Sequence, residues 1–242
     1  MAQIITGNNL LDTWQSSCQF LRNNGKRAFN LILEIHDPTN FVYLNDWIDN
    51  RNPKNYGGSD DINDVINTIF PFKTYERNIF FNRNLFYDHY KRIYLRGKRI
   101  NSRQSWGTYF QRLINYSKHF TNPIGVNQLE KAIIALSGDR VRRNSIVFHL
   151  TSSDLDSNTR LLGAPCWQFG EILWDGETDR ISLLVVYRNH DYFNKTLGNL
   201  IGLSKLLDFL CNESGKQPGK LIVHSANAYY NCSHSVLDLM IA

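Results

Sequence analysis

Residues 164–191 read APCWQFGEILWDGETDRISLLVVYRNHD, and this stretch decides the fold class. Its aromatic and β-branched residues predict one strand over residues 166–174 and a second over residues 180–188. The five residues between the two strands, DGETD, are polar and include a glycine, as is typical of a tight turn. The stretch therefore predicts a β-hairpin that brings Cys166 and Arg188 to the same end of a sheet.

Outside this hairpin, periodicity predicts helices mainly in the first half of the chain and further strands in the second. The helices are expected around residues 10–21, 62–69, 106–114, 126–136 and 198–211, and the strands over residues 28–35, 145–150 and 220–225. Ser59 is expected as the N-cap of the helix that carries Ile62. Residues 46–60 are expected to be irregular, and residues 226–242 to form a tail. Helices flanking a largely antiparallel sheet give an α+β layer architecture, with residues 1–242 as a single domain.

The composition indicates a folded, soluble protein. The chain has 242 residues, of which 42% are hydrophobic, and it contains no apolar run near the roughly 20 residues that span a bilayer. No secretory signal is legible at the N-terminus, so we expect a cytoplasmic location. The cysteines (Cys18, Cys166, Cys211 and Cys232) lie far apart without a CxxC pair, which argues against a zinc knuckle and a disulfide framework; no metal is expected.

The charge is mildly basic, with 27 Lys and Arg against 22 Asp and Glu. That balance fits a nucleotide phosphate, a nucleic acid or plain solubility equally well. Residues 89–103 are the densest basic stretch, interleaved with tyrosine, isoleucine and leucine. A solvated helix or hairpin face is the preferred interpretation of this stretch, and a nucleic-acid surface is the alternative.

Cys166 is the candidate nucleophile because of its neighbours. It follows Pro165 at the start of one predicted strand, and Arg188 ends the next strand. A guanidinium group near a thiol favours the thiolate, which is the nucleophilic form. The structural alternatives are a buried cysteine, a local ion pair between Arg188 and Asp191, and a helix cap at Asn199.

The order and spacing of these residues resemble the thymidylate synthase and pyrimidine nucleotide hydroxymethylase family. The family's Pro-Cys-aromatic nucleophile motif is matched by residues 165–167, and its Arg-Ser-x-Asp motif by residues 188–191, with Asn189 in the serine position. Its pyrimidine-reading asparagine lies eleven residues after that arginine, where this chain has Asn199. Its paired arginines resemble Arg142 and Arg143. The resemblance covers residues 126–234.

The resemblance implies a thymidylate synthase-like layered sheet with flanking helices and a homodimer formed through the sheet face. It also implies a pyrimidine nucleotide C5 methyl- or hydroxymethyltransferase with 5,10-methylenetetrahydrofolate as one-carbon donor. Cys166 would add to ring C6, and Asp191 would order water beside the rings. A pyrimidine nucleoside monophosphate would be held by Arg188, Asn189, Asn199, and by Arg142 and Arg143 reaching across the dimer. Neither a membrane nor a nucleic acid is an expected partner.

The sequence departs from the family pattern near its end. Tyr229 and Asn231 stand where the family has the histidine and tyrosine that bind the sugar hydroxyl, which leaves a ribonucleotide, an altered sugar or a shifted pose open. Few residues follow this motif, so hydroxymethyl transfer, which needs no hydride step, is favoured over full methylation. Asn199 favours uracil over cytosine. The alternative is a catalytically degenerate protein that binds a pyrimidine nucleotide without turnover.

Overall fold

The predicted hairpin is the centre of the fold. A computed structural model describes residues 2–77, 82–100, 106–118, 125–138, 146–156 and 164–242. In it, β4 (Trp167–Asp175) and β5 (Arg180–Tyr187) pair antiparallel, with Asp175 opposite Arg180. The Asp175 carboxylate closes the turn, since it accepts hydrogen bonds from the Glu177 amide at 3.0 Å and the Thr178 hydroxyl at 2.6 Å. The turn chemistry read from the sequence is therefore confirmed.

The sheet that contains this hairpin is mixed. Its strand order is β1 (Gln3–Gly7), β2 (Arg27–Ile35), β7 (Gln217–Tyr229), β5, β4 and β3 (Val147–His149), and β6 (His190–Asp191) pairs with the end of β7. Strand β7 runs parallel to β5 and β6, and β1 runs parallel to β2, whereas the other pairs are antiparallel. The expected largely antiparallel sheet is wrong in this respect. The reason is that α9 (Thr196–Ser214) follows β5 and precedes β7 in the sequence. This helix carries the chain back along the sheet, so that β7 runs parallel to β5.

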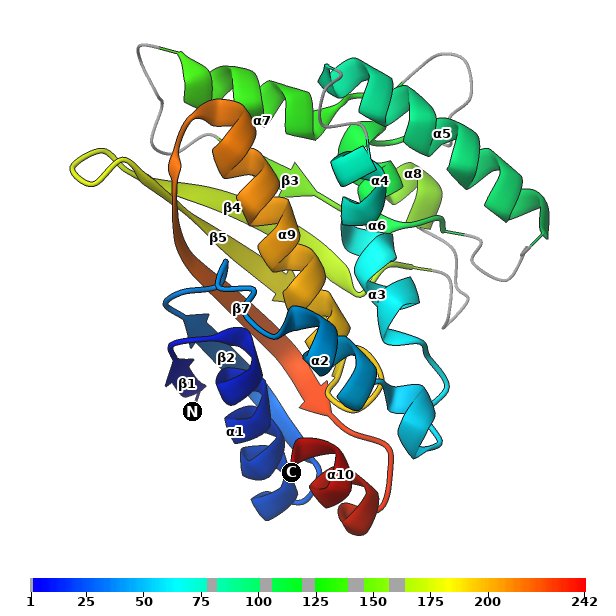
Figure 1. The fold of residues 1–242 in the computed structure, drawn as a ribbon, viewed down its shortest axis with the longest axis vertical. Coiled ribbons are helices and arrows are strands. Elements are labelled where there is room, and N and C mark those ends of the chain that lie inside the picture. Colours follow the sequence, from blue (N-terminus) through cyan, green and yellow to red (C-terminus); the bar gives the residue numbers. More distant parts are fainter. Residues whose placement is uncertain (1, 78–81, 101–105, 119–124, 139–145, 157–163) are drawn as a thin grey trace.

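Helices cover one face of the sheet, and α9 crosses that face in Figure 1. The side chains that point to this face are fully buried, among them Leu33, Leu183, Val185, Leu221 and Val223. The α9 helix is itself buried around most of its circumference, which explains why it lacks a narrow apolar stripe. Strand residues alternate, so those between the buried ones point to the opposite face and are half-buried.

The remaining helices surround this two-layer core, giving the expected α+β arrangement of a sheet with flanking helices (Figure 1). They are α1 (Leu10–Asn23), α2 (Leu44–Asn50), η1 (Pro53–Tyr56), α3 (Ile62–Ile69), α4 (Phe72–Arg77), α5 (Arg83–Ile100), α6 (Tyr109–Ile114), α7 (Gln128–Ser137), α8 (Ser153–Asp156) and α10 (His234–Ile241). Within the described parts of the chain, no helix combines the length and apolar character needed to cross a lipid bilayer.

Two expectations about local structure are wrong. Residues 46–60 contain α2 and η1 rather than an irregular segment, because the Asn52 side chain accepts hydrogen bonds from the Lys54 and Ile62 amides and so orders the turn. The N-cap of α3 is Asp61, whose carboxylate accepts from the Asn63 amide at 2.8 Å.

The C-terminal residues are also more ordered than the sequence predicts. Strand β7 extends to Tyr229, and α10 then begins after Ser233, whose hydroxyl accepts a hydrogen bond from the Val236 amide. Leu237 and Met240 on α10 are buried, so this helix is part of the core rather than a tail.

Two glycines let α3 lie directly against α9. A Cβ atom on Gly198 would stand 2.9 Å from the Val65 Cβ, and one on Gly202 would stand 2.9 Å from the Ile69 Cβ. The backbone carbonyl of Ile66 would lie 3.1 Å from the added Gly202 Cβ. These distances are shorter than normal carbon contacts, so α9 accepts α3 at this closeness only because both positions lack a side chain.

Candidate functional site

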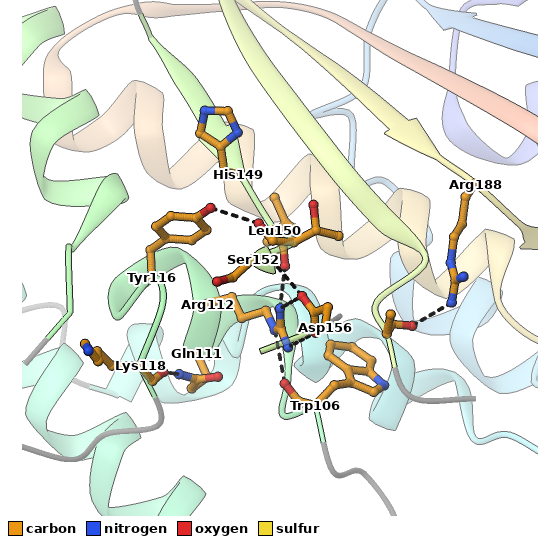
Figure 2. Close-up of polar contacts among 12 residues, drawn as sticks. Trp106, Gln111, Arg112, Tyr116, Lys118, His149, Leu150, Ser152, Asp156 and Arg188 are labelled. Atoms are coloured by element: carbon orange, nitrogen blue, oxygen red, sulfur yellow. Dashed lines mark hydrogen bonds and ion pairs between the residues drawn. The ribbon is translucent and has the colours of Figure 1, made fainter. Parts of the chain in front are cut away.

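Cys166 and Arg188 lie together at one end of the sheet, as the hairpin predicts. Cys166 immediately precedes β4, and its carbonyl accepts a 2.9 Å hydrogen bond from the Arg188 amide, which immediately follows β5. The Arg188 side chain then turns back, and its Nη2 donates to the Ala164 carbonyl at 2.9 Å (Figure 2). The backbone pairing and the guanidinium contact together fix the arginine beside the thiol.

The Cys166 thiol has opposing influences on its acidity. Burial is the largest of these and raises the pKa of the half-buried thiol above its ordinary value. The positive charge of Arg188, a hydrogen bond from Arg188 and the charge of Lys195 act in the opposite direction. The thiol is therefore mostly protonated at neutral pH. Its basic neighbours nevertheless make it easier to deprotonate than burial alone would.

Arg188 keeps donors for a further acceptor. Among the described residues its Nε has no hydrogen-bond partner, while Nη2 donates to the Ala164 carbonyl. A guanidinium group has five N–H donors in a planar fork that matches carboxylate and phosphate oxygens. The arginine is half-buried, so an anion that reached it would be partly shielded from water.

Asp191 forms the turn that leads from β6 into α9. Its Oδ1 accepts from the amides of Phe193 at 3.0 Å and Asn194 at 3.1 Å, and its Oδ2 accepts from the Asn194 side chain at 2.9 Å. None of the ion pairs found among the described residues joins Asp191 to Arg188, so the alternative of a local ion pair between them is not supported.

Tyr229 belongs to the same end of the sheet. It pairs with Asp191 on β6 and with Arg27 on β2. Burial raises the pKa of its hydroxyl, and the charges of Asp191 and Cys166 raise it further, while Arg27 acts against them. Tyr229 is thus electrostatically coupled to the thiol and to the carboxylate.

Two further predicted residues are exposed, and the predicted arginine pair lies outside the described residues. Asn189 is exposed, and its Oδ1 accepts from Asn227 Nδ2 at 2.8 Å. Asn231 is exposed beyond the end of β7. Arg142 and Arg143 fall within residues 139–145, which lie outside the described residues.

Asn199 is buried in the first turns of α9, and only 4% of its surface is exposed. It is not the helix cap, because the N-cap position is Lys195. Its Nδ2 lies 3.1 Å from Nε2 of His190, a residue that sequence reasoning passed over. His190 is buried, and its Nδ1 lies 2.9 Å from the Ser225 hydroxyl. Burial lowers the pKa of His190 to about 3, so the ring is neutral.

A second polar cluster is centred on Arg112 (Figure 2). Arg112 on α6 forms an ion pair with Asp156 and donates to the carbonyls of Trp106 and Leu150. The same helix carries Tyr109, whose hydroxyl accepts a 3.3 Å hydrogen bond from the Trp167 amide next to Cys166. The described residues include no group of three or more His, Cys, Asp or Glu side chains placed to hold a metal ion.

Comparison with known proteins finds distant relatives. The sequence matches no protein-family model. It is 29% identical over 123 residues to a protein of Methanococcoides burtonii named "Putative thymidylate synthase", and 30% identical over 124 residues to proteins of the same name from Methanosarcina acetivorans and Methanosarcina barkeri. Each match covers 50% of this chain and 51% of the relative, so the chain matches the curated relatives over about half of their length. The similarity indicates a distant thymidylate synthase-like relationship.

Proposed function

We propose that this chain is a thymidylate synthase-like pyrimidine nucleotide C5 methyl- or hydroxymethyltransferase with Cys166 as its nucleophile. The observation that carries the proposal is the pairing of Cys166 with Arg188, whose guanidinium group lies beside the thiol and keeps unused donors. The names of the archaeal relatives support the same class of reaction.

In this reaction the Cys166 thiolate forms a bond to C6 of the pyrimidine ring, and the electron pair of the C5–C6 double bond moves to C5. The carbon at C5 thereby becomes the nucleophile that receives the one-carbon unit. The C5 proton would then pass to a base as the bond between the transferred carbon and its donor breaks, and addition of water (for hydroxymethyl) or of hydride from the folate (for methyl) to that carbon would expel the Cys166 thiolate from C6. Arg188 binds the nucleotide phosphate through charge-assisted hydrogen bonds, with Arg142 and Arg143 of a partner subunit. Asn199 reads the edge of the ring, Asn189 also binds the nucleotide, and Tyr229 and Asn231 are available to the sugar.

The one-carbon donor in this proposal is 5,10-methylenetetrahydrofolate, which supplies the carbon that C5 receives. Asp191 is the residue that would face the pterin and its waters. Its carboxylate accepts three hydrogen bonds from its own turn, which leaves it about one of roughly four acceptor positions. The group is held in a fixed orientation next to Tyr229 and keeps this acceptor, so it fits that role.

A homodimer is part of the proposal, and the sheet face opposite α9 is its interface. Two cross-strand rows on this face contain apolar side chains, with Ile222 beside Leu184 and Val186 beside Phe169. These residues are half-buried in the single chain. A second copy laid on this face would bury them.

Covalent trapping tests the proposal directly. The protein is incubated with 5-fluoro-dUMP or 5-fluoro-CMP and methylenetetrahydrofolate, and the mass of the intact protein and of its peptides is measured. We expect an adduct on the peptide that contains Cys166. The variant Cys166→Ser should form no adduct, whereas Cys232→Ser, which removes another half-buried thiol, should form it as the unaltered chain does. Absence of an adduct with both fluoronucleotides would overturn the transferase.

The second candidate function is nucleotide binding without turnover. The raised pKa of Cys166 favours it, because a mostly protonated thiol is a poor nucleophile. The same experiment separates the two candidates. Calorimetric binding of dUMP or CMP without any fluoronucleotide adduct would support this second function.

A further inference from the structure

A chain of buried polar side chains runs from α9 to the centre of the sheet. It begins at the Asn199 amide, passes through the His190 ring at 3.1 Å and reaches the Ser225 hydroxyl at 2.9 Å. The Tyr192 hydroxyl lies 3.1 Å from the same Ser225 oxygen and is the last group in this series of hydrogen bonds. All four residues are buried, so each of these hydrogen bonds forms away from water.

The direction of the first two bonds follows from the groups involved. An amide nitrogen can only donate, so Asn199 Nδ2 donates and Nε2 of His190 accepts. The imidazole is neutral, and its proton is therefore on Nδ1, which donates to the Ser225 hydroxyl. The ring is also held in plane by Tyr187, which stacks on it with centroids 4.2 Å apart and an interplanar angle of 2°.

The orientation of this amide matters for base recognition. Uracil presents a donor at N3 and an acceptor at O4, whereas cytosine presents an acceptor at N3 and a donor at its amino group. An asparagine amide has one acceptor and two donors, and a half-turn about its last bond exchanges the sides on which they lie. An asparagine whose amide rotates freely can therefore pair with either base. An amide held in one orientation can form both hydrogen bonds with only one of the two bases.

We propose that His190 is a positioning residue that fixes the Asn199 amide, so that the site accepts uracil and rejects cytosine. This inference rests on the proposed function, because it assumes that Asn199 reads a pyrimidine. His190 acts through Asn199 and makes no contact with the nucleotide. Ser225 acts indirectly. Its hydroxyl accepts a hydrogen bond from Nδ1–H of His190 and so favours the tautomer in which the unprotonated Nε2 faces Asn199.

Affinities for two nucleotides test this role. Dissociation constants for dUMP and dCMP are measured by calorimetry for the unaltered chain and for His190→Gln and Ser225→Ala. We expect the unaltered chain to favour dUMP by roughly tenfold or more, since the wrong base leaves buried polar groups unpaired. In both variants the ratio should fall to within about threefold, because the amide is free to turn. A purely structural role would weaken both nucleotides together and leave the ratio unchanged.

Ser204→Ala is the matched control. Ser204 on α9 is buried, as Ser225 is. Its hydroxyl donates to the Pro38 carbonyl and takes no part in the hydrogen bonds that link Asn199, His190 and Ser225. The variant should retain the full preference for dUMP. If His190→Gln and Ser225→Ala also retain it while the unaltered chain discriminates, the inference is overturned and the proposed function stands.

The tautomer is tested without any nucleotide. Long-range ¹H–¹⁵N NMR spectra of the unaltered protein should show His190 with a protonated Nδ1 and an unprotonated Nε2 between about pH 5 and pH 8. A protonated Nε2, or a histidine that titrates in this range, would overturn the inference even if the variants do not fold. If neither nucleotide binds to the unaltered chain, the proposed function fails instead.

Discussion

Arg112 and Asp156 form a bidentate ion pair inside the protein. Their Nη1–Oδ2 and Nη2–Oδ1 distances are 2.6 Å and 2.8 Å, and their side chains are only 2% and 8% exposed. Arg112 also donates to the Trp106 and Leu150 carbonyls, and Asp156 accepts from the Ser152 amide at 2.8 Å. The charges are therefore well compensated, and the pair joins α6 to α8 and to the end of β3.

Removing one partner of this pair should strongly destabilise the protein. Asp156→Ala leaves the Arg112 charge buried without a counterion, and we expect the free energy of unfolding to fall by about 3–5 kcal/mol. Urea denaturation measures this change. The control is Asp238→Ala, which breaks a pair whose side chains are 35% and 41% exposed and should therefore destabilise the protein far less than Asp156→Ala does. Equal losses in the two variants would contradict the prediction.

Alkylation of Cys166 should speed up with pH and depend on Arg188. The thiolate is the reactive form, and burial raises the thiol pKa, so the rate should still be rising above neutral pH. Arg188→Ala removes the strongest influence that lowers this pKa and should shift the rate profile to higher pH, whereas Arg188→Lys should shift it less. Iodoacetamide labelling followed by peptide mass spectrometry reports the rate at each cysteine. An unchanged profile in Arg188→Ala would refute the coupling.

An added methyl group where α3 packs against Gly198 and Gly202 of α9 should lower the stability of the protein. Gly202→Ala places a Cβ within 2.9 Å of Ile69 and 3.1 Å of the Ile66 carbonyl, and overpacking of this kind costs about 1–3 kcal/mol. Gly97→Ala on α5 is the matched control, because nothing lies within 4 Å of its added Cβ. It should stabilise the protein by about 0.5–1 kcal/mol through higher helix propensity. Thermal unfolding should therefore show shifts of opposite sign.

Acid should weaken the contact between α5 and α7. A hydrogen bond from Arg83 is the main cause that lowers the pKa of Glu130, and burial opposes it. Because the folded-state pKa is lowered, this stabilisation is complete above the unfolded pKa of about 4.3 and is lost as pH falls through the folded pKa.

The variant Arg83→Met should therefore lose about 1 kcal/mol or more at neutral pH and much less in acid. Urea midpoints at about pH 6 and pH 3 measure the difference. Arg96→Met changes an exposed arginine of the same helix and should show little dependence on pH. A loss in Arg83→Met that is equal at both pH values would contradict the assignment.

The sheet face opposite α9 should govern self-association. Leu184→Glu places a carboxylate in the middle of this face, beside Ile222 and Glu171, where burial against a second copy would be costly. Analytical ultracentrifugation should show a dimer for the unaltered chain and a monomer for the variant. Leu239→Glu, on an exposed position of α10, should leave the dimer intact. A monomeric unaltered chain would refute the interface.

The sequence predicts those parts of the fold that depend on local chemistry. The hairpin of β4 and β5 follows from alternating residues around a polar turn, and α1 follows from its apolar spacing and its end near Asn23. The parallel pairing of β5 with β7 was not predicted, because it depends on where α9 returns the chain. Strand β1 and helix α10 were missed because they are short and are ordered by neighbours distant in sequence.

In the candidate site, too, the contact that depends on local sequence was predictable and the one that depends on distant packing was not. The approach of Cys166 to Arg188 was predictable because both lie at paired ends of one hairpin. The position of His190 was not, since its partner Ser225 is 35 residues away on another strand. A histidine in the variable position of a motif gives no sequence signal of burial. Its neutrality and hydrogen bonds follow only from the packing around it.

The glycine seam on α9 also bears on how this protein can evolve. Gly198 immediately precedes Asn199, so the α3 residue that fills the gap, Val65, also limits how far the asparagine backbone can move. A larger side chain at Val65 would press on the α9 backbone at Gly198, beside Asn199, without altering any residue proposed to touch a nucleotide. Natural variation in α3 is thus a route by which descendants of this chain can change their preferred base.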